Sequence, residues 1–121
     1  MEQFKFKELK VWNKALEFAS ESMDVTESMK GHYRIAEQLE AAAASVAQNI
    51  AEGDGRQTVK ENIQYLNISR GSLNEAITVL NLLCKRRLMS QEKLTEMEAM
   101  GMEIIKMINS LVTHKRKLIQ K

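Results

Sequence analysis

Few side chains of this 121-residue chain could carry out metal or acid–base chemistry. The sequence holds two histidines, His32 and His114, and one cysteine, Cys84. A di-iron site in a helical protein needs Glu-x-x-His pairs, but Met29 and Leu111 stand three residues before the histidines. A single cysteine also cannot supply the thiolates of a zinc quartet. We therefore expect neither a metal site nor a cofactor.

Nucleophilic catalysis and phosphate binding lack their usual partners as well. Ser45, Ser69 and Ser72 have no histidine at a spacing that would supply a base. The segment 53–56 (Gly-Asp-Gly-Arg) shares two glycines with a phosphate-binding loop, but its acid would repel phosphate, so we interpret it as the end of a helix. We expect no enzymatic activity. The alternative, an enzyme with an unrecognised site, requires a pocket in which several carboxylates with shifted pKa values converge.

Two short runs of cations remain as candidates for binding chemistry. The net charge is only +2, but residues 1–60 hold 8 basic and 10 acidic side chains, whereas residues 61–121 hold 10 and 6. Cations at the end of a helix can simply stabilise its dipole. In a symmetric assembly the same runs would repeat into a positive ring that binds the phosphate backbone of RNA or DNA. The predicted nucleic-acid-binding residues are Lys85, Arg86, Arg87, Lys115, Arg116 and Lys117.

A further set of polar residues shares one flank of a helix predicted over residues 33–54, beside its apolar stripe, at 100° per residue. Arg70, in the next helix, stands at a position of the heptad repeat where the other residues are apolar. Because an unpaired buried charge is strongly unfavourable, it needs a hydrogen-bond acceptor or access to water. Glu52 and Asn49 are its expected partners. We predict a structural seam that consists of Ser45, Asn49, Glu52, Arg56 and Arg70.

Composition limits the fold that positions these residues. The chain is 44% hydrophobic and 5% aromatic, with five glycines and no proline. A sandwich or barrel needs many turns, so this composition favours an all-α fold. The length suits one domain with its own core, and we expect residues 1–121 to form a single four-helix bundle domain.

Apolar periodicity and capping signals divide the chain into a short extended arm and four helices. Gly31 and Gly55 end the first two helices, while a capping box of Thr58 with Glu61 and the N-cap Ser90 begin the last two. Short connections force neighbouring helices to be antiparallel, which predicts an up-down-up-down four-helix bundle with the cationic runs at opposite ends. The predicted segments are an arm over about residues 1–7 and helices over about 8–29, 33–54, 59–88 and 91 to the end.

The first helix carries two apolar stripes, which is more than one core face requires. One stripe runs from Trp12 to Met23 and the other from Val11 to Met29. We expect part of this surface to contact another subunit, although a central helix in a monomer would show the same pattern. The last helix carries Met102 opposite its apolar stripe, either as ordinary exposure or as a second contact. The predicted oligomer interface consists of Val11, Phe18, Val25 and Met102.

The start of the chain lacks the apolar core of a signal peptide, and no apolar run approaches the roughly 20 residues of a membrane span. A single cysteine excludes an internal disulfide and suits a reducing compartment. We expect a soluble, cytoplasmic protein without a membrane partner.

Three segments resemble motifs of a known family. Residues 45–56 (Ser-Val-Ala-Gln-Asn-Ile-Ala-Glu-Gly-Asp-Gly-Arg) resemble Ser-Ile-x-x-Asn-Ile-Ala-Glu-Gly-x-Gly-Arg, and residues 71–75 (Gly-Ser-Leu-Asn-Glu) resemble Gly-Ser-Leu-x-Glu. Residues 9–15 match the opening Leu-x-Val-Trp-x-x-Ala. In this order and spacing, the motifs are similar to those of the four-helix bundle proteins encoded in intervening sequences of 23S ribosomal RNA genes.

The resemblance implies an up-down four-helix bundle that assembles as a homopentamer. Relatives include the accessory variability protein of diversity-generating retroelements, a basic pentameric barrel that binds nucleic acid and a reverse transcriptase. For most members of the family the activity is unknown. Our hypothesis is non-catalytic binding of a macromolecule, with RNA or DNA as the leading candidate and a nucleic-acid-processing protein as a further one. Relatives often carry Gln-Leu-Arg-Arg-Ala-Ala where residues 38–42 read Gln-Leu-Glu-Ala-Ala, and Glu40 favours the alternative, a protein-interaction scaffold that binds no nucleic acid.

Overall fold

The computed structural model describes residues 2–119, and within them the chain is all-α. A short 3₁₀ helix, η1 (Lys5–Glu8), precedes four α-helices. The predicted fold class is confirmed, while the last two residues of the predicted final helix lie outside the described residues. The α-helices are α1 (Lys10–Glu27), α2 (Tyr33–Asp54), α3 (Val59–Lys85) and α4 (Gln91–Ile119).

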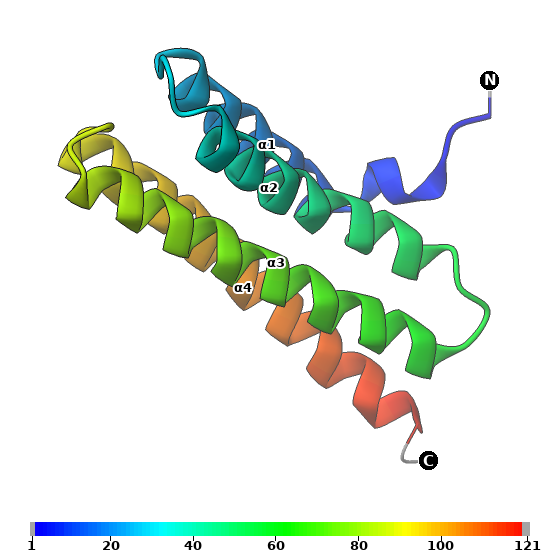
Figure 1. The fold of residues 1–121 in the computed structure, drawn as a ribbon. Coiled ribbons are helices and arrows are strands. Elements are labelled where there is room, and N and C mark those ends of the chain that lie inside the picture. Colours follow the sequence, from blue (N-terminus) through cyan, green and yellow to red (C-terminus); the bar gives the residue numbers. More distant parts are fainter. Residues whose placement is uncertain (1, 120–121) are drawn as a thin grey trace.

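The helices alternate in direction along the bundle, as Figure 1 shows. α1 packs against α2 and α4, and α3 packs against the same two helices. The α1–α2 and α3–α4 connections lie at one end, which we call the hairpin end. The N-terminal arm, the α2–α3 connection and the C-terminal part of α4 lie at the other, which we call the terminal end. The predicted up-down-up-down topology is therefore confirmed.

The core runs the length of the bundle and takes side chains from all four helices. Burying a large apolar side chain stabilises a fold by about 1.5–3 kcal/mol, so a core of this size can hold the bundle together without metal or disulfide. The largest fully buried apolar side chains are Phe18, Leu39, Val46, Leu73, Leu80, Leu83, Met97, Ile104 and Ile108.

The stripe of α1 that faces this core is the one that we assigned to another subunit. Val11, Phe18 and Val25 are 3%, 0% and 6% exposed, so their predicted role in an oligomer interface is wrong. Their spacing continues through Ser22, which is buried because its hydroxyl donates to the backbone oxygen of Phe18 at 2.9 Å. The sequence shows both stripes but not which of them faces the core, because that depends on how α1 is rotated against α2 and α4. Met102 is 55% exposed, and its role in assembly stays a prediction.

The predicted caps of α3 and α4 are confirmed. The hydroxyl oxygen of Thr58 accepts a hydrogen bond from the backbone N–H of Glu61 at 3.1 Å, and the hydroxyl group donates to the Glu61 carboxylate at 2.9 Å. Ser90 accepts from the backbone N–H of Lys93 at 3.0 Å. Such caps satisfy backbone donors that the first turn of a helix leaves free.

Three predicted boundaries are wrong by a few residues. The arm is not extended throughout, because η1 forms at its end and the ring of Phe6 packs on Trp12 with centroids 5.2 Å apart. α1 ends at Glu27, before Gly31, although Gly31 does have the expected positive φ of 80°. α3 ends at Lys85 rather than at residue 88, because the backbone reverses in the turn that follows.

Candidate functional site

The two cationic runs lie at opposite ends of the bundle, as the antiparallel arrangement requires. Lys85, Arg86 and Arg87 lie at the hairpin end, at the end of α3, and all three are exposed. The run 115–117 lies in the last turns of α4 at the terminal end, where Arg116 and Lys117 are exposed and Lys115 is half-buried. One chain therefore presents two separate positive regions rather than one patch.

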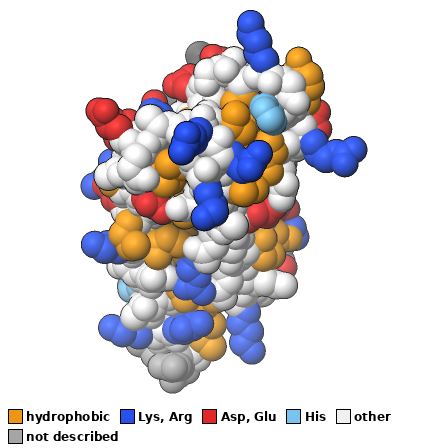
Figure 2. Space-filling model, turned by 60° about the vertical axis from the view of Figure 1, so that its left-hand side comes forward, with side chains coloured by type: hydrophobic (Ala, Val, Ile, Leu, Met, Phe, Trp, Pro, Cys, Tyr) orange, Lys and Arg blue, Asp and Glu red, His pale blue; other side chains and the backbone are white. Residues whose placement is uncertain are grey.

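Further cations at the hairpin end were missed from the sequence. Lys30 lies in the α1–α2 connection and Arg34 in the first turn of α2, and both are exposed. Figure 2, which turns the hairpin end forward, shows lysine and arginine side chains spread over this part of the surface between hydrophobic patches. The cationic surface at this end thus draws on two connections that are far apart in sequence.

Arg87 adopts a backbone conformation that normally belongs to glycine. Its φ is +61°, the only positive φ of a non-glycine residue among the described residues. The backbone N–H of Leu88 donates to the carbonyl of Leu83 at 2.8 Å, and that of Arg87 donates to Cys84 at 3.0 Å, a Schellman arrangement. A left-handed arginine is unfavourable by about 1–2 kcal/mol. Glycine at position 87 would make the turn more stable. Arginine instead places a guanidinium there, a group that suits phosphate.

The polar seam forms a hydrogen-bonded contact between α2 and α3. The hydroxyl groups of Ser45 and Ser72 are 2.8 Å apart, and the Asn49 amide donates to the Ser45 hydroxyl at 2.9 Å. Ser69, fully buried, donates to the backbone oxygen of Val46 at 2.7 Å. Because these groups satisfy one another inside the helix pair, they act in packing rather than in chemistry.

Glu52 and Arg56 belong to a separate group at the terminal end. The guanidinium of Arg56 donates to Glu52 at 2.5 Å and to the Tyr65 hydroxyl at 2.7 Å, and its central carbon lies 4.8 Å from the Tyr65 ring centroid. The side chains of Arg56 and Glu52 are 36% and 55% exposed. An exposed pair of this kind is worth at most about 1 kcal/mol.

Arg70 does not bond to Glu52 or Asn49, so that prediction is wrong. Its guanidinium donates to the side-chain oxygen of Asn109 in α4 at 2.5 Å and to that of Asn67 at 2.8 Å. The physical reason is that Arg70 lies on the side of α3 that faces α4. Ser45 and Asn49 belong to α2 and lie at the α2–α3 contact instead. Arg70 is half-buried, and neutral amide oxygens satisfy it.

Within residues 2–119, no three His, Cys, Asp or Glu side chains are arranged so that they could hold a metal ion. Lys93 in α4 hydrogen-bonds to Glu21 in α1, and this bond raises the pKa of the Lys93 amine. Burial acts against the shift, while the charges of Glu21 and Glu96 add to it.

In the described part of the chain, no helix combines the length and the hydropathy needed to cross a bilayer.

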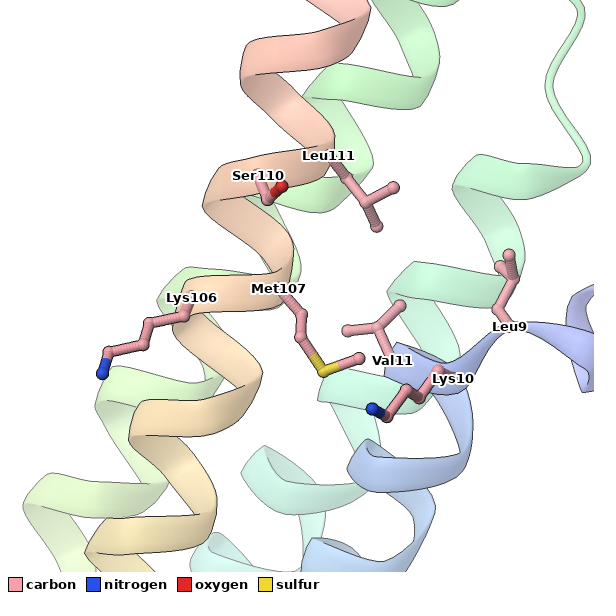
Figure 3. Close-up of a pocket in the computed structure, with 7 residues that line it drawn as sticks. All are labelled: Leu9, Lys10, Val11, Lys106, Met107, Ser110 and Leu111. Carbon is pink, nitrogen blue, oxygen red and sulfur yellow. The ribbon is translucent and has the colours of Figure 1, made fainter.

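Two grooves on opposite sides of α1 were not predicted. The α1/α4 groove has a volume of about 390 Å³ and lies at the terminal end (Figure 3). The α1/α2 groove has a volume of about 500 Å³, and its walls contain no charged side chain among the described residues. Only the stripe from Trp12 to Met23 had signalled exposed apolar surface there. Its lining residues are Phe6, Trp12, Leu16, Ala19, Ser20, Met23, Ala44, Ala47, Gln48 and Ala51.

Comparisons with known proteins identify similar chains. A family model described as 23S rRNA-intervening sequence protein matches residues 7–110, which include all three segments that carry the resemblance. Among solved structures, the chain is similar to a protein of unknown function from the S23 ribosomal protein family of Bacteroides thetaiotaomicron. The two are 25% identical with a TM-score of 0.78, and the match covers 84% of this chain and 97% of the other. No curated protein matches the chain. The relation to the accessory variability protein stays a prediction.

Proposed function

We propose, because this chain belongs to the 23S rRNA-intervening sequence protein family, that it is a non-catalytic homopentamer of four-helix bundles that binds nucleic acid. The observation that carries the proposal is the pair of exposed cationic runs at the two ends of each bundle. Family membership confirms the resemblance drawn from the motifs and supports the fold. Nucleic-acid binding and assembly are our own inferences.

The charge distribution supports contact with phosphate. Arg86 and Arg87 are consecutive, exposed and held by a turn at the hairpin end. At the terminal end, the sequence contains no acidic residue after Glu103. Arg116 and Lys117 therefore have no acidic side chain near them within α4. Arginine is well suited to phosphate because its guanidinium offers a planar set of donors.

Two exposed apolar surfaces support assembly. Leu16 and Met23 are 48% and 51% exposed on the wall of the α1/α2 groove. On α3, Ile68 and Leu82 are exposed on the same face as Gly71. A ring needs two different complementary patches on each subunit, since every contact in it is head-to-tail. We propose that the α1/α2 groove of one subunit receives the α3 face of the next.

Gly71 gives this contact a physical reason. It lies in the interior of α3, where glycine is less favourable than alanine by about 1 kcal/mol. A β-carbon there would meet no described atom within 4 Å outside its own helix backbone, so nothing in the single chain requires glycine. A neighbouring subunit that approaches this face closely would require it.

The assembly would strengthen weak individual contacts. Cyclic symmetry repeats each cationic run around the axis, so a ring has one positive rim at the hairpin ends and another at the terminal ends. Linked sites bind with an affinity well above that of one site. We also propose a cytoplasmic location, which the lone thiol of Cys84 supports.

The test combines native mass with salt dependence. Native mass spectrometry is expected to give five times the 13.8 kDa chain. Fluorescence anisotropy with a labelled single-stranded RNA and a duplex DNA is expected to show binding that falls steeply with salt, because binding releases counterions. A monomeric mass overturns the assembly. Affinity that is absent, or equal at low and high salt, overturns the nucleic-acid function.

A second candidate is a protein-interaction scaffold without nucleic acid. The net charge of only +2 favours it, because a nearly balanced chain attracts a polyanion only weakly overall. Glu40, which first suggested this alternative, does not support it, because its carboxylate accepts a 2.5 Å hydrogen bond from Thr26 between α1 and α2. Recovery of a specific protein partner that survives nuclease treatment would favour the scaffold.

A further inference from the structure

We infer that the α1/α4 groove is a docking site for an amphipathic helix of a partner protein, with acidic side chains beside its apolar face. The groove is separate from the cationic run at the hairpin end and from the α1/α2 groove that we assign to assembly, and it adjoins the cationic run 115–117 at the terminal end. Its lining comes from the start of α1 and the second half of α4. The inference depends on its floor, its rim and the charge around it.

The floor is apolar. Val11 is buried beneath the groove, and Leu9, Met107 and Leu111 lie half-buried along it. In Figure 3, Met107 points from α4 toward α1, and Val11 points back toward α4. An elongated groove between two helices that is floored by Leu, Val and Met is the kind of surface that accepts the apolar face of a third helix. Phosphate contacts would use none of these side chains.

The rim is positive on both sides. Lys10 of α1 and Lys106 of α4 both line the groove, and in Figure 3 the Lys10 side chain extends toward α4 whereas the Lys106 side chain points away from α1 along the outer side of α4. Elsewhere along the α1/α4 contact, lysines have acidic partners, since Lys14 pairs with Glu103 at 3.1 Å and Lys93 pairs with Glu21. No ion pair within residues 2–119 includes Lys10 or Lys106. Their charges are therefore available to a partner that carries acids.

The surface continues past the groove along α4. Leu118 and Ile119 are 47% and 40% exposed, and Leu118 lies a heptad after Leu111 on the same side of the helix. From Lys106 to Leu118 the helix rises about 18 Å, which corresponds to about three turns of a partner helix. This segment of α4 carries Lys106, Lys115, Arg116 and Lys117 and no acid, and the acid that lies beside it is Asp54 of α2, next to Lys115. The balance of charge is positive, so a complementary partner is acidic.

The test uses two designed helical peptides of about 16 residues, roughly four turns. Both carry the same leucine stripe, and the flanking positions are glutamate in one and lysine in the other. The wild-type protein is expected to bind the glutamate peptide about tenfold more tightly at low salt. The double variant Lys10→Glu/Lys106→Glu is expected to abolish this preference, because Lys115, Arg116 and Lys117 remain to offset the two new acids. Both sites are exposed, so the fold is expected to survive the exchange.

A matched pair of variants separates the groove from general charge attraction. Met107→Gln, on the floor, is expected to weaken binding of the glutamate peptide several-fold. Tyr33→Gln, at an exposed position of α2 outside both grooves, is expected to leave that binding unchanged. Trp12 is the single tryptophan and lines the other groove. Its fluorescence is expected to stay constant when the peptide binds.

Three results would overturn the inference. Equal affinity for the two peptides, or a preference that survives the double charge reversal, would remove the role of Lys10 and Lys106. A leucine-free glutamate peptide that binds as tightly, with Met107→Gln without effect, would leave only a surface that attracts polyanions such as RNA. A change in Trp12 fluorescence on binding would place the peptide in the α1/α2 groove instead.

Discussion

Gly53 of α2 and Tyr65 of α3 are in such close contact that a β-carbon at position 53 would stand 2.7 Å from the β-carbon of Tyr65. The backbone oxygen of Asn62 would lie only 3.3 Å away. Asn62 also donates a 2.6 Å hydrogen bond to the backbone oxygen of Gly53. The absence of a side chain at Gly53 therefore sets how closely α2 and α3 approach at the terminal end.

Gly53→Ala is expected to lower the free energy of unfolding by about 1–3 kcal/mol, because the added carbon overpacks a backbone contact and outweighs the better helix propensity of alanine. Urea denaturation measures the change. Gly101→Ala is the matched control, since its β-carbon would meet the flexible end of Ile77 at 3.1 Å. Equal losses in the two variants would contradict this explanation.

Gly71→Ala is expected to have the opposite effect on the single bundle. Without a close neighbour outside its own helix, the alanine is expected to raise the free energy of unfolding of the subunit by about 1 kcal/mol. The same methyl group would stand in the proposed contact between subunits and is expected to reduce the pentamer fraction in native mass spectrometry. A pentamer that remains as stable as wild type would show that the α3 face is not the interface.

Arg87→Gly is expected to stabilise the fold and weaken nucleic-acid binding. Glycine adopts a φ of +61° without strain, so the melting temperature is expected to rise with a gain of about 1 kcal/mol. The loss of one guanidinium is expected to lower affinity for RNA in the salt titration. Arg86→Gly provides the control, because its φ of −85° gives glycine no such advantage. A destabilised Arg87→Gly would refute the account of this turn.

Glu52→Ala is expected to change the free energy of unfolding by no more than about 1 kcal/mol, because Glu52 pairs with an exposed Arg56 rather than with Arg70. Differential scanning calorimetry can measure the change. Arg70→Ala makes the comparison, since it removes two hydrogen bonds to Asn67 and Asn109 and is expected to destabilise the bundle more. The reverse order of the two effects would be the contrary result.

The Lys93–Glu21 contact predicts a loss of stability at alkaline pH. The folded pKa of Lys93 is raised above its ordinary value of 10.5, so its stabilising contribution is fully present below pH 10.5 and disappears as pH rises through the folded pKa. The difference in free energy of unfolding between wild type and Lys93→Met is therefore expected to be constant near neutral pH and to shrink above 10.5. A difference that grows there would mean that the sign is wrong.

Helix number, topology and caps could be predicted because each has a local signal. These signals can be recognised in short stretches of sequence. They are the caps at Thr58 and Ser90, the small number of turn residues and the repeated apolar heptads. The choice between the two stripes of α1 could not be made in this way. Both stripes are apolar in sequence, and the one that faces the core is set by the packing of α1 against α2 and α4, which are distant in sequence for most of the contact.

The candidate surfaces divide in the same manner. The cationic runs are contiguous, so their residues and their separation between opposite ends followed from sequence. The partner of Arg70 did not, because Asn109 lies 39 positions away on a helix whose rotation relative to α3 is set by packing. The α1/α4 groove could not be predicted either, since Lys10 and Lys106 come to line one groove only when two helices distant in sequence pack together.

Residues 2 and 119 emerge at the same end of the bundle. Any polypeptide fused before or after this chain, whether a fluorescent label or a natural extension, would therefore leave from the terminal end and would keep clear of Arg86 and Arg87 at the hairpin end. In a ring with all subunits oriented alike, such attachments would crowd a single rim. A bulky fusion would then obstruct the rim at the terminal ends and leave the rim at the hairpin ends open. Loss of ligand binding in such a fusion would place the ligand at the terminal-end rim.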